Sequence, residues 1–364
     1  MIPLDLRPRL TLDVTPLLEA QWTGIPVFTR RLVQALERSG RVALDYAVRL
    51  DRVPAEAVCR AIRQGTGIFL RDLHERLAQD GAEPVDAAQP LLHPSVKQTP
   101  GAAAREASTI HDISTLVMPE THAVANVAYH LDPLREQLLT DEVVFCCSEA
   151  TRAALAATFP WVAPKAWLLM QHVDWPEEFA LYERNLPPVG LGRYAVVIGT
   201  IEPRKNLRLL LRALEHPAVA RAGIRFVVVG RRGWLADQAL SRLGAEAQKR
   251  ITFTGFVSEF VKYRLLRHAE FLVLPSVYEG FGIPALEAMS LGKPVLASLT
   301  SSFPEVVGDA GAYFDPFSVE EFAAALQEIA DPRRLAELAP KALARAASFD
   351  AERMAAPVLE WLGA

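Results

Sequence analysis

Short runs of apolar, mostly β-branched residues alternate with helix-like segments through the second half of the chain. Runs of this kind, apolar at nearly every position, are typical of parallel strands that helices cover on both faces. The strands are expected at residues 194–200, 226–230, 251–254, 271–275 and 294–298. The intervening helices are expected at residues 207–214, 235–243, 261–268, 283–291 and 319–329. The pattern therefore predicts an α/β fold with a parallel sheet.

The first half of the chain is less regular but similar in kind. Strands are expected at residues 10–14, 108–111 and 142–147, and an amphipathic helix at residues 26–36. That helix has Phe28, Leu32, Val33 and Leu36 on one side. Residues 51–105 are rich in proline and alanine and give no clear assignment.

Residues 175–193 are rich in proline and glycine, which indicates a linker between two domains. We therefore expect two doubly wound, Rossmann-like domains, at residues 1–180 and 190–345. A helix at about residues 350–364 is expected to pack back on the first domain. Such domains bind ligands at the carboxyl ends of their strands, so the predicted site is a central cleft that the two domains face.

Composition narrows the class of protein only slightly. The 364 residues are 51% hydrophobic and 23% charged, as in an ordinary globular protein, and a net charge of −4 gives no drive toward nucleic acid. Three cysteines without metal-ligand spacing favour a reducing compartment. The first residues lack the pattern of a signal peptide, and no apolar run is long enough to span a membrane. A cytoplasmic protein is expected, with peripheral contact at the inner face of the membrane left open.

Two glutamates, Glu279 and Glu287, stand eight positions apart in the stretch YEGFGIPALEAMSLGKPV. Glu279 follows the predicted strand 271–275, where Gly280 and Gly282 allow backbone N–H groups to approach a ligand closely. The helix that begins near Pro284 has an N-terminus that favours anions. Glu287 lies one turn into this nearly apolar helix, where a carboxylate needs a partner.

This stretch has two other interpretations. In the first, the glutamates have only structural roles, with Glu287 paired to a lysine such as Lys293 and Glu279 in a surface loop. In the second, residues 280–285 form a dinucleotide-binding loop, because they formally fit G-x-G-x-x-A. Against the second, the strand at residues 294–298 ends without an acid for a ribose, and Pro284 falls inside the motif.

The stretch resembles the E-x7-E signature of retaining glycosyltransferases with the GT-B fold, most closely family 4, which includes bacterial mannosyl-, rhamnosyl- and glucosyltransferases. Further segments resemble that family in the same order along the chain. They are TGI (23–25), TIHDISTLVMPE (109–120), GTIEPRKN (199–206), TFTGFVS (252–258) and TSSFPEVVGDAGAYFDP (300–316). The resemblance covers most of residues 190–330 and only scattered segments before residue 180.

The resemblance implies a role for each matching residue on the donor side. Arg204 and Lys205 follow a strand and would hold the diphosphate, Arg204 as a fork and Lys205 as a point charge. Glu287 would accept hydrogen bonds from the ribose hydroxyls, and Glu279 would contact the donor sugar. The amides of Gly280, Phe281 and Gly282 would hold sugar or phosphate oxygens, and the base would stack near Phe256 and Val257.

In the first domain the resemblance implies that His111 contacts the donor sugar near the reacting carbon and that Gly24 approaches phosphate or acceptor. The chain also departs from the family pattern. Thr200 stands where many members have arginine, Gly24 is followed by Ile-Pro-Val-Phe28 rather than Ile-Gly-Arg-Tyr, and His172 replaces glycine in the segment 171–174.

The sequence thus predicts a retaining hexosyltransferase without a cofactor, and without a metal because no D-x-D pair is placed to hold one. GDP-mannose is the expected donor, and a saccharide or lipid-linked saccharide of surface polysaccharide the expected acceptor. The acceptor would bind the first domain, where Arg30 and Arg31 could face a lipid diphosphate or an anionic leaflet, unless they lie on an ordinary solvated helix face. The alternatives are a GT-B epimerase or phosphorylase, and an inactive GT-B scaffold in an assembly complex.

Overall fold

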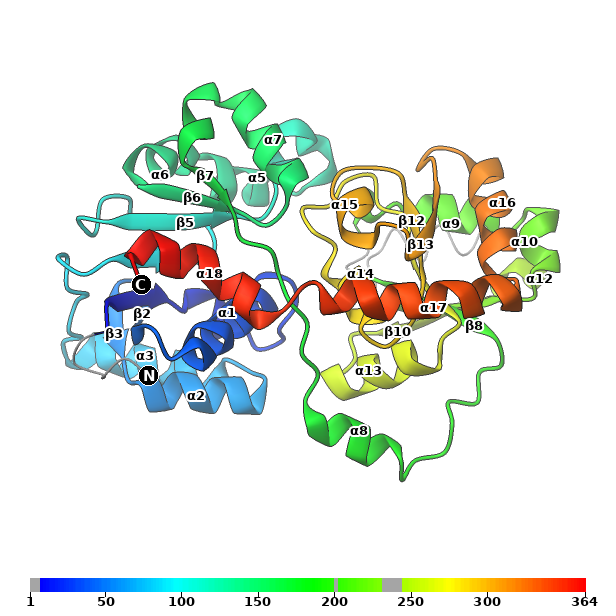
Figure 1. Ribbon diagram of the computed structural model, residues 1–364, viewed down its shortest axis with the longest axis horizontal. Helices are drawn as coiled ribbons and strands as arrows, with labels where there is room; N and C mark the ends of the chain where they lie inside the picture. Colours follow the sequence, from blue (N-terminus) through cyan, green and yellow to red (C-terminus); the bar gives the residue numbers. More distant parts are fainter. Residues whose placement is uncertain (1–6, 200–201, 231–243) are drawn as a thin grey trace. The chain divides into compact units, whose positions relative to one another are not determined.

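The computed structural model describes residues 7–199, 202–230 and 244–364, which form two compact units. The first unit comprises Met1–Val117, Val124–His172 and Phe349–Ala364, and the second comprises Met118–Ala123 and Val173–Ser348. Each unit has its own sheet, and these are the two parallel-sheet domains that the sequence predicts (Figure 1).

The first unit is built on a seven-stranded sheet in the order β3-β2-β1-β4-β5-β6-β7, parallel except that β3 pairs antiparallel with β2. The strands are β1 (Arg9–Asp13), β2 (Ala43–Val48), β3 (Asp51–Val53), β4 (Leu91–His93), β5 (Glu106–Ile110), β6 (Val143–Cys146) and β7 (Ala166–Leu168). The helices are α1 (Ile25–Ser39), α2 (Ala55–Gln64), α3 (Ile68–Asp80), α4 (Ser114–Val117), α5 (Val124–Leu131), α6 (Leu134–Thr140), α7 (Glu149–Thr158) and α18 (Ala351–Leu362), with 3-10 turns η2 (Thr15–Leu18) and η4 (Pro160–Lys165).

The C-terminal helix α18 packs on α1, so the two ends of the chain share one hydrophobic core (Figure 1). Asp350 caps α18 by accepting a hydrogen bond from the backbone N–H of Arg353, which fixes where the helix begins. Residues 51–105, which the sequence left unassigned, contain β3, α2, α3 and β4.

The second unit is built on a six-stranded sheet, parallel throughout, in the order β10-β9-β8-β11-β12-β13. The strands are β8 (Tyr194–Ile198), β9 (Arg225–Val229), β10 (Ile251–Gly255), β11 (Phe271–Leu274), β12 (Val295–Ser298) and β13 (Gly311–Phe314). The helices are α8 (Glu177–Glu183), α9 (Leu207–Ala213), α10 (Pro217–Arg221), α12 (Ala245–Gln248), α13 (Glu259–His268), α14 (Ile283–Met289), α15 (Phe303–Val307), α16 (Val319–Ile329) and α17 (Pro332–Ala347), with 3-10 turns η3 (Pro119–Thr121) and η5 (Pro203–Lys205).

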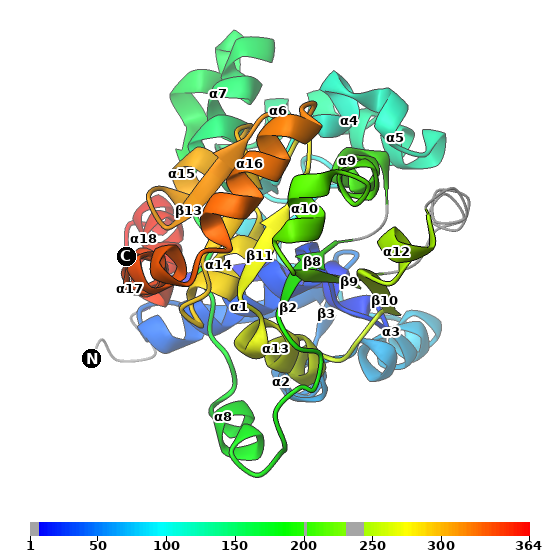
Figure 2. The ribbon, with the colours of Figure 1, turned by 90° about the vertical axis from the view of Figure 1, so that its right-hand side faces the viewer.

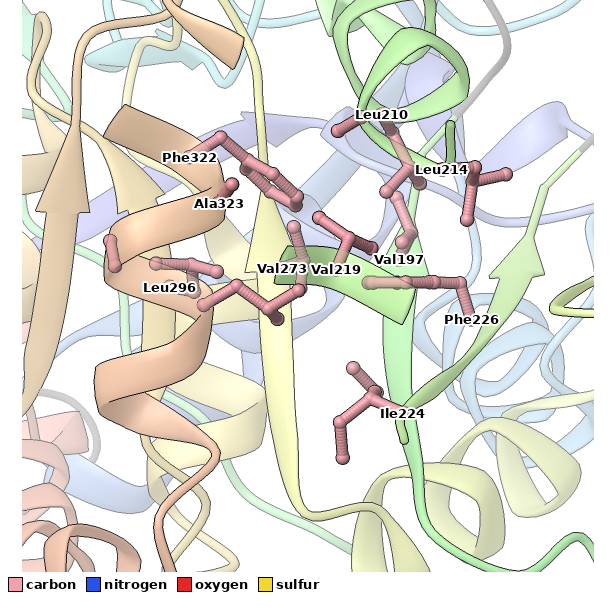
Figure 3. Close-up of a cluster of buried hydrophobic side chains, with 14 of the residues drawn as sticks. Val197, Leu210, Leu214, Val219, Ile224, Phe226, Val273, Leu296, Phe322 and Ala323 are labelled. Carbon is pink, nitrogen blue, oxygen red and sulfur yellow. The ribbon is translucent and has the colours of Figure 1, made fainter. Parts of the chain in front are cut away.

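Helices cover both faces of this second sheet, as its continuous apolar strands require. Figure 2 shows α9, α10 and α16 on one side of the strands and α13 on the other. The first of these layers contributes Leu210, Val219 and Phe322 to a buried cluster with Val197 and Phe226 of the strands (Figure 3). The strands expected in this half all form, each within two residues of its predicted ends. The expected helix 235–243 and Thr200 lie outside the described residues.

The predicted linker at residues 175–193 is only partly extended. It contains α8, whose Phe179 packs against Phe260 and Tyr263 of α13. Glu183 of α8 also forms ion pairs with two residues of α13, Arg264 and His268. The sequence did not predict this helix, because prolines and glycines flank its short run of apolar and acidic residues. The stretch therefore belongs to the second unit.

Candidate active site

Arg204, Lys205 and Glu279 of the second unit gather at the carboxyl ends of β8 and β11, the adjacent strands from which the sheet extends in opposite directions. This is the place where open α/β sheets bind their ligands. Gly199 follows β8, and Ser276 comes two residues after β11. A small pocket lies there, lined by Val197, Ile198, Gly199, Lys205, Leu207, Val228, Pro275 and Ser276.

Glu279 is the centre of an ionic cluster beside this pocket. Its Oε1 atom lies 2.5 Å from Lys205 Nζ and accepts a 2.7 Å hydrogen bond from Ser276 Oγ, while its Oε2 atom lies 3.4 Å from Arg204 Nη1. Only 8% of the Glu279 surface is exposed. Burial alone would raise the pKa of Glu279, but the charges of Lys205 and Arg204 outweigh it and lower that pKa below its ordinary value. The cluster therefore holds a carboxylate between two cations.

Several groups fix the geometry of this cluster. Arg204 also pairs with Glu202 at 2.9 Å and donates to the Tyr278 carbonyl at 3.0 Å. The backbone of Glu279 is held on both sides, because its N–H donates to Ser301 Oγ and its carbonyl accepts from Ser302 Oγ. Contacts within the protein therefore orient the carboxylate and both cations without a ligand.

The turn of Gly280, Phe281 and Gly282 is buried and leads directly into α14. Gly282 has φ +88°, in the left-handed region that favours glycine. A Cβ atom at Gly282 would also lie 2.8 Å from the ring of Phe303. Both the backbone conformation and the lack of space therefore require glycine at this position.

Glu287 lies on α14, is 1% exposed, and pairs through Oε1 with Lys262 Nζ of α13 at 2.7 Å. The alternative partner Lys293 is wrong, because the ammonium group comes from a neighbouring helix rather than from the end of α14. Lys262 Nζ also lies 5.4 Å from the centre of the Trp175 ring. Trp175 in turn donates to Ser290 Oγ, so α13, α14 and the segment before α8 meet around this buried carboxylate.

Phe256 and Val257 follow the edge strand β10 and precede α13. Phe256 is 39% exposed and Val257 is partly buried, so the Phe256 ring is not part of the core. An exposed aromatic face at the carboxyl end of a strand is chemically suited to stacking against a nucleotide base.

In the first unit, His111 follows β5 and packs edge-on against Phe28 of α1, with ring centroids 4.6 Å apart. Its Nε2 atom donates to the Pro94 carbonyl at 2.8 Å, which assigns the proton to Nε2 and a lone pair to Nδ1. Burial lowers the pKa of His111, so the ring is neutral at pH 7. Gly24 is the N-cap of α1 and has φ +47°. The first unit therefore brings His111 close to the helix that follows the Gly24 turn.

The expected basic face on α1 is wrong. Arg31 is fully buried and Arg30 is 8% exposed, so neither side chain is available to face an anionic leaflet. Because α18 packs on α1 from the far end of the chain, the helix is surrounded on more sides than its own sequence indicates. The unexpected His172 is also internal, with Nε2 3.4 Å from the Arg31 carbonyl.

The sequence did not identify Lys262, Ser276 or Ser301, although all three contact the two glutamates. Ser276 lies three residues before Glu279, so its proximity was a usable signal. Lys262 comes from another element and carried none, whereas Ser301 lies in the recognised segment 300–316 but was not singled out within it. Among the described residues, no helix is long and apolar enough to cross a bilayer.

Comparison with known proteins agrees with this arrangement. Residues 192–331 match the model of the family described as "Glycosyl transferases group 1". The chain is 34% identical over 257 residues to O-antigen chain mannosyltransferase B of Escherichia coli. This match covers 68% of the present chain and 67% of the relative. It is 31% identical over 161 residues to the serotype-specific mannosyltransferase WbdA of Escherichia coli, covering 43% of this chain and 20% of the relative.

Among solved structures, the chain resembles Anabaena HepE in complex with UDP and glucose, with a TM-score of 0.66. The two are 17% identical, and the match covers 98% of this chain and 100% of the other. At that identity the likeness concerns the fold alone.

Proposed function

The chain belongs to the group 1 glycosyltransferases, and from this membership we propose that it transfers a mannosyl group to a growing surface polysaccharide. The proposed donor is GDP-mannose, and the proposed acceptor is a saccharide or lipid-linked saccharide. The reaction retains the anomeric configuration and needs no metal ion. One observation carries the proposal, namely the 34% identity over 257 residues to an O-antigen chain mannosyltransferase.

The donor diphosphate is assigned to Arg204 and Lys205. Both cations lie at the carboxyl edge of the sheet, beside the pocket between β8 and β11. A departing diphosphate needs positive charge, and the guanidinium and ammonium groups supply it without a metal. Glu279 holds the two cations close together in advance, which lowers the cost of ordering them around phosphate.

Glu287 and Phe256 are assigned to the nucleoside. Glu287 would accept hydrogen bonds from the ribose hydroxyls, with Lys262 keeping the carboxylate ionised and in place. Phe256 offers the exposed ring for the base. UDP is the nucleotide in the HepE structure, so the choice of GDP rests on the mannosyltransferase relatives and on family resemblance.

The reaction itself needs no covalent nucleophile from the chain. The bond from the anomeric carbon to the diphosphate oxygen breaks, and the acceptor hydroxyl oxygen forms its bond on the same face. The hydroxyl proton passes to the leaving phosphate oxygen. His111 is neutral with its Nδ1 lone pair unprotonated, so it would accept a hydrogen bond from a sugar hydroxyl rather than donate a proton.

A thermal-shift panel of GDP, UDP, ADP and dTDP tests the donor assignment directly. GDP at 100 times its dissociation constant should stabilise the protein by about 2.7 kcal/mol, and the other three should stabilise it less. Stabilisation by UDP alone would reassign the base. Failure of every nucleotide to bind would favour an inactive scaffold and overturn the proposal.

Product analysis tests the chemistry. GDP-mannose and a mannoside acceptor should give an α-linked product by NMR, with activity that survives EDTA. A β-linked product would contradict retention. Complete loss of activity on chelation, with rescue by magnesium, would show that a metal takes part.

A further inference from the structure

The first unit contains the strand arrangement at which open α/β sheets bind ligands, and none of its recognised motifs lies at the ends of the two strands concerned. Its sheet extends in opposite directions from the adjacent strands β1 and β4, just as the second sheet does from β8 and β11. Ligands of open α/β sheets bind outside the carboxyl ends of such a pair. In this unit those two strands end at Asp13 and His93.

Asp13 and His93 form a buried hydrogen-bonded pair. His93 Nδ1 lies 3.0 Å from Asp13 Oδ2, and Asp13 Oδ1 accepts from both the backbone N–H and the hydroxyl of Thr15. Burial would raise the pKa of Asp13, but the His93 contact and the Thr15 hydrogen bonds outweigh it and lower that pKa. Asp13 is therefore a carboxylate that can only accept, which assigns the proton of the pair to His93 Nδ1.

The other ring nitrogen of His93, Nε2, makes no hydrogen bond to any described residue. Among the described residues, His93 Nε2 is a buried polar atom without a hydrogen-bond partner, and only 4% of the side chain is exposed. Leaving a buried polar group unsatisfied costs about 1–3 kcal/mol. The missing partner of His93 Nε2 is therefore a polar group such as a hydroxyl, which can both donate and accept a hydrogen bond. Asp13 keeps 13% of its side chain exposed, so the pair is largely buried but still reaches solvent.

The neighbouring residues connect this pair to the predicted site. Pro94, next to His93, accepts the hydrogen bond from His111 Nε2, and His111 contacts Phe28 of α1. Asp13 and His93 end β1 and β4, and His111 directly follows the next strand, β5, so all three lie at one edge of the sheet.

We propose that Asp13 and His93 bind the saccharide acceptor, with His93 Nε2 hydrogen-bonded to an acceptor hydroxyl and Asp13 fixing the orientation of the ring. This rests on the proposed function, in which the second unit takes the nucleotide sugar. The first unit's corresponding strand ends then receive the other substrate. Sugars are rich in hydroxyl groups, which supply the hydrogen-bonding partner that this nitrogen lacks.

The variant His93→Asn isolates the nitrogen in question. The asparagine amide can take the place of Nδ1 and keep the bond to Asp13, but it has no atom at the position of Nε2. The matched control is His74→Gln, in the same unit. His74 is also buried and pairs through Nε2 with Asp51 at 2.9 Å, a contact that glutamine can retain.

The assay uses GDP-mannose as donor and mannobiose as the acceptor probe. His93→Asn should raise the KM for mannobiose about 2- to 13-fold, the range of one typical hydrogen bond. Its affinity for GDP and its slow hydrolysis of GDP-mannose in water should equal those of the parent and of His74→Gln. In a sample with ¹⁵N-labelled histidine, mannobiose should shift the His93 Nε2 signal and GDP should not.

Four outcomes overturn the inference while leaving the proposed function intact. These are an unchanged KM for mannobiose in His93→Asn, an equal change in His74→Gln, a loss of GDP affinity in His93→Asn, and a parent that binds GDP but gives no response to mannobiose. A parent that binds no nucleotide overturns the proposed function itself, so the two failures are distinguishable.

Discussion

Lys205 and Glu279 lie 74 residues apart in the sequence, yet their side chains meet at 2.5 Å at the carboxyl edge of the second sheet. The contact joins a residue that we propose binds phosphate with one that the family resemblance implies for the donor sugar. Glu279 is largely buried, whereas Lys205 keeps 22% of its side chain exposed, so the ammonium group can reach a ligand without leaving its partner. This ion pair is where the nucleotide and sugar parts of the proposed donor would meet.

Replacing Lys205 with alanine should weaken binding of GDP by about 1.5–3 kcal/mol, the contribution of a hydrogen bond to a charged group. Binding of guanosine, which lacks phosphate, should change little. Calorimetry with both ligands measures the difference. Lys249→Ala is the matched control, since Lys249 pairs with Glu246 at 2.6 Å but is largely exposed, just after the end of α12. Equal losses for GDP and guanosine would remove Lys205 from the diphosphate site.

Glu287 and Lys262 should respond unequally to substitution, because only one of them reaches solvent. Side-chain exposure is 2% for Glu287 and 18% for Lys262. Lys262→Met leaves a buried carboxylate without its counter-ion and should lower Tm clearly. Glu287→Gln leaves the Lys262 ammonium group where water can reach it, so the Tm of this variant should fall less than that of Lys262→Met. Its nucleotide affinity and turnover should nevertheless fall. If Glu287→Gln instead melts early while its folded fraction has normal kinetics, the glutamate has a structural role.

The sequence predicted much of the second unit because its apolar strands are continuous and its motifs follow those strands directly. The same logic placed Glu279, Lys205 and Arg204 at one sheet edge. It could not supply the partner of Glu287, because Lys262 comes from a different helix and its spacing from Glu287 carries no signal. In the first unit, β3 and β4 have three residues each, which is too short for a periodic pattern.

The packing of α18 on α1 was unpredictable for a different reason. Nothing within α1 shows that a helix more than 300 positions later packs on it. Local patterns predict which side of a helix faces its own sheet, but not what else covers it. The His93–Asp13 pair was missed likewise, because its members are 80 positions apart and β4 was not recognised.

The lowered pKa of Glu279 gives stability a defined pH dependence. A carboxyl group with a folded-state pKa below its ordinary value of 4.5 stabilises the fold above that value. The contribution disappears as the pH falls through the lowered folded-state pKa. The Tm difference between the parent and Glu279→Gln should therefore be largest near neutral pH and shrink below about pH 4.5. A difference that grows toward acid pH would contradict the ionised state of Glu279.

Trp361 should control the stability of the first unit without affecting nucleotide binding by the second. It is 5% exposed, lies edge-on to Phe145 at 6.3 Å, and donates from Nε1 to Glu142 at 3.0 Å. Replacing a buried tryptophan with alanine typically costs about 3–5 kcal/mol, so Trp361→Ala should destabilise the core that α18 shares with α1. Because each unit has its own core, calorimetry should resolve two transitions, and GDP should raise only one of them. Trp361→Ala should lower the transition that GDP does not raise, with GDP affinity unchanged. A variant that lowers the GDP-sensitive transition would show that the nucleotide depends on the first unit.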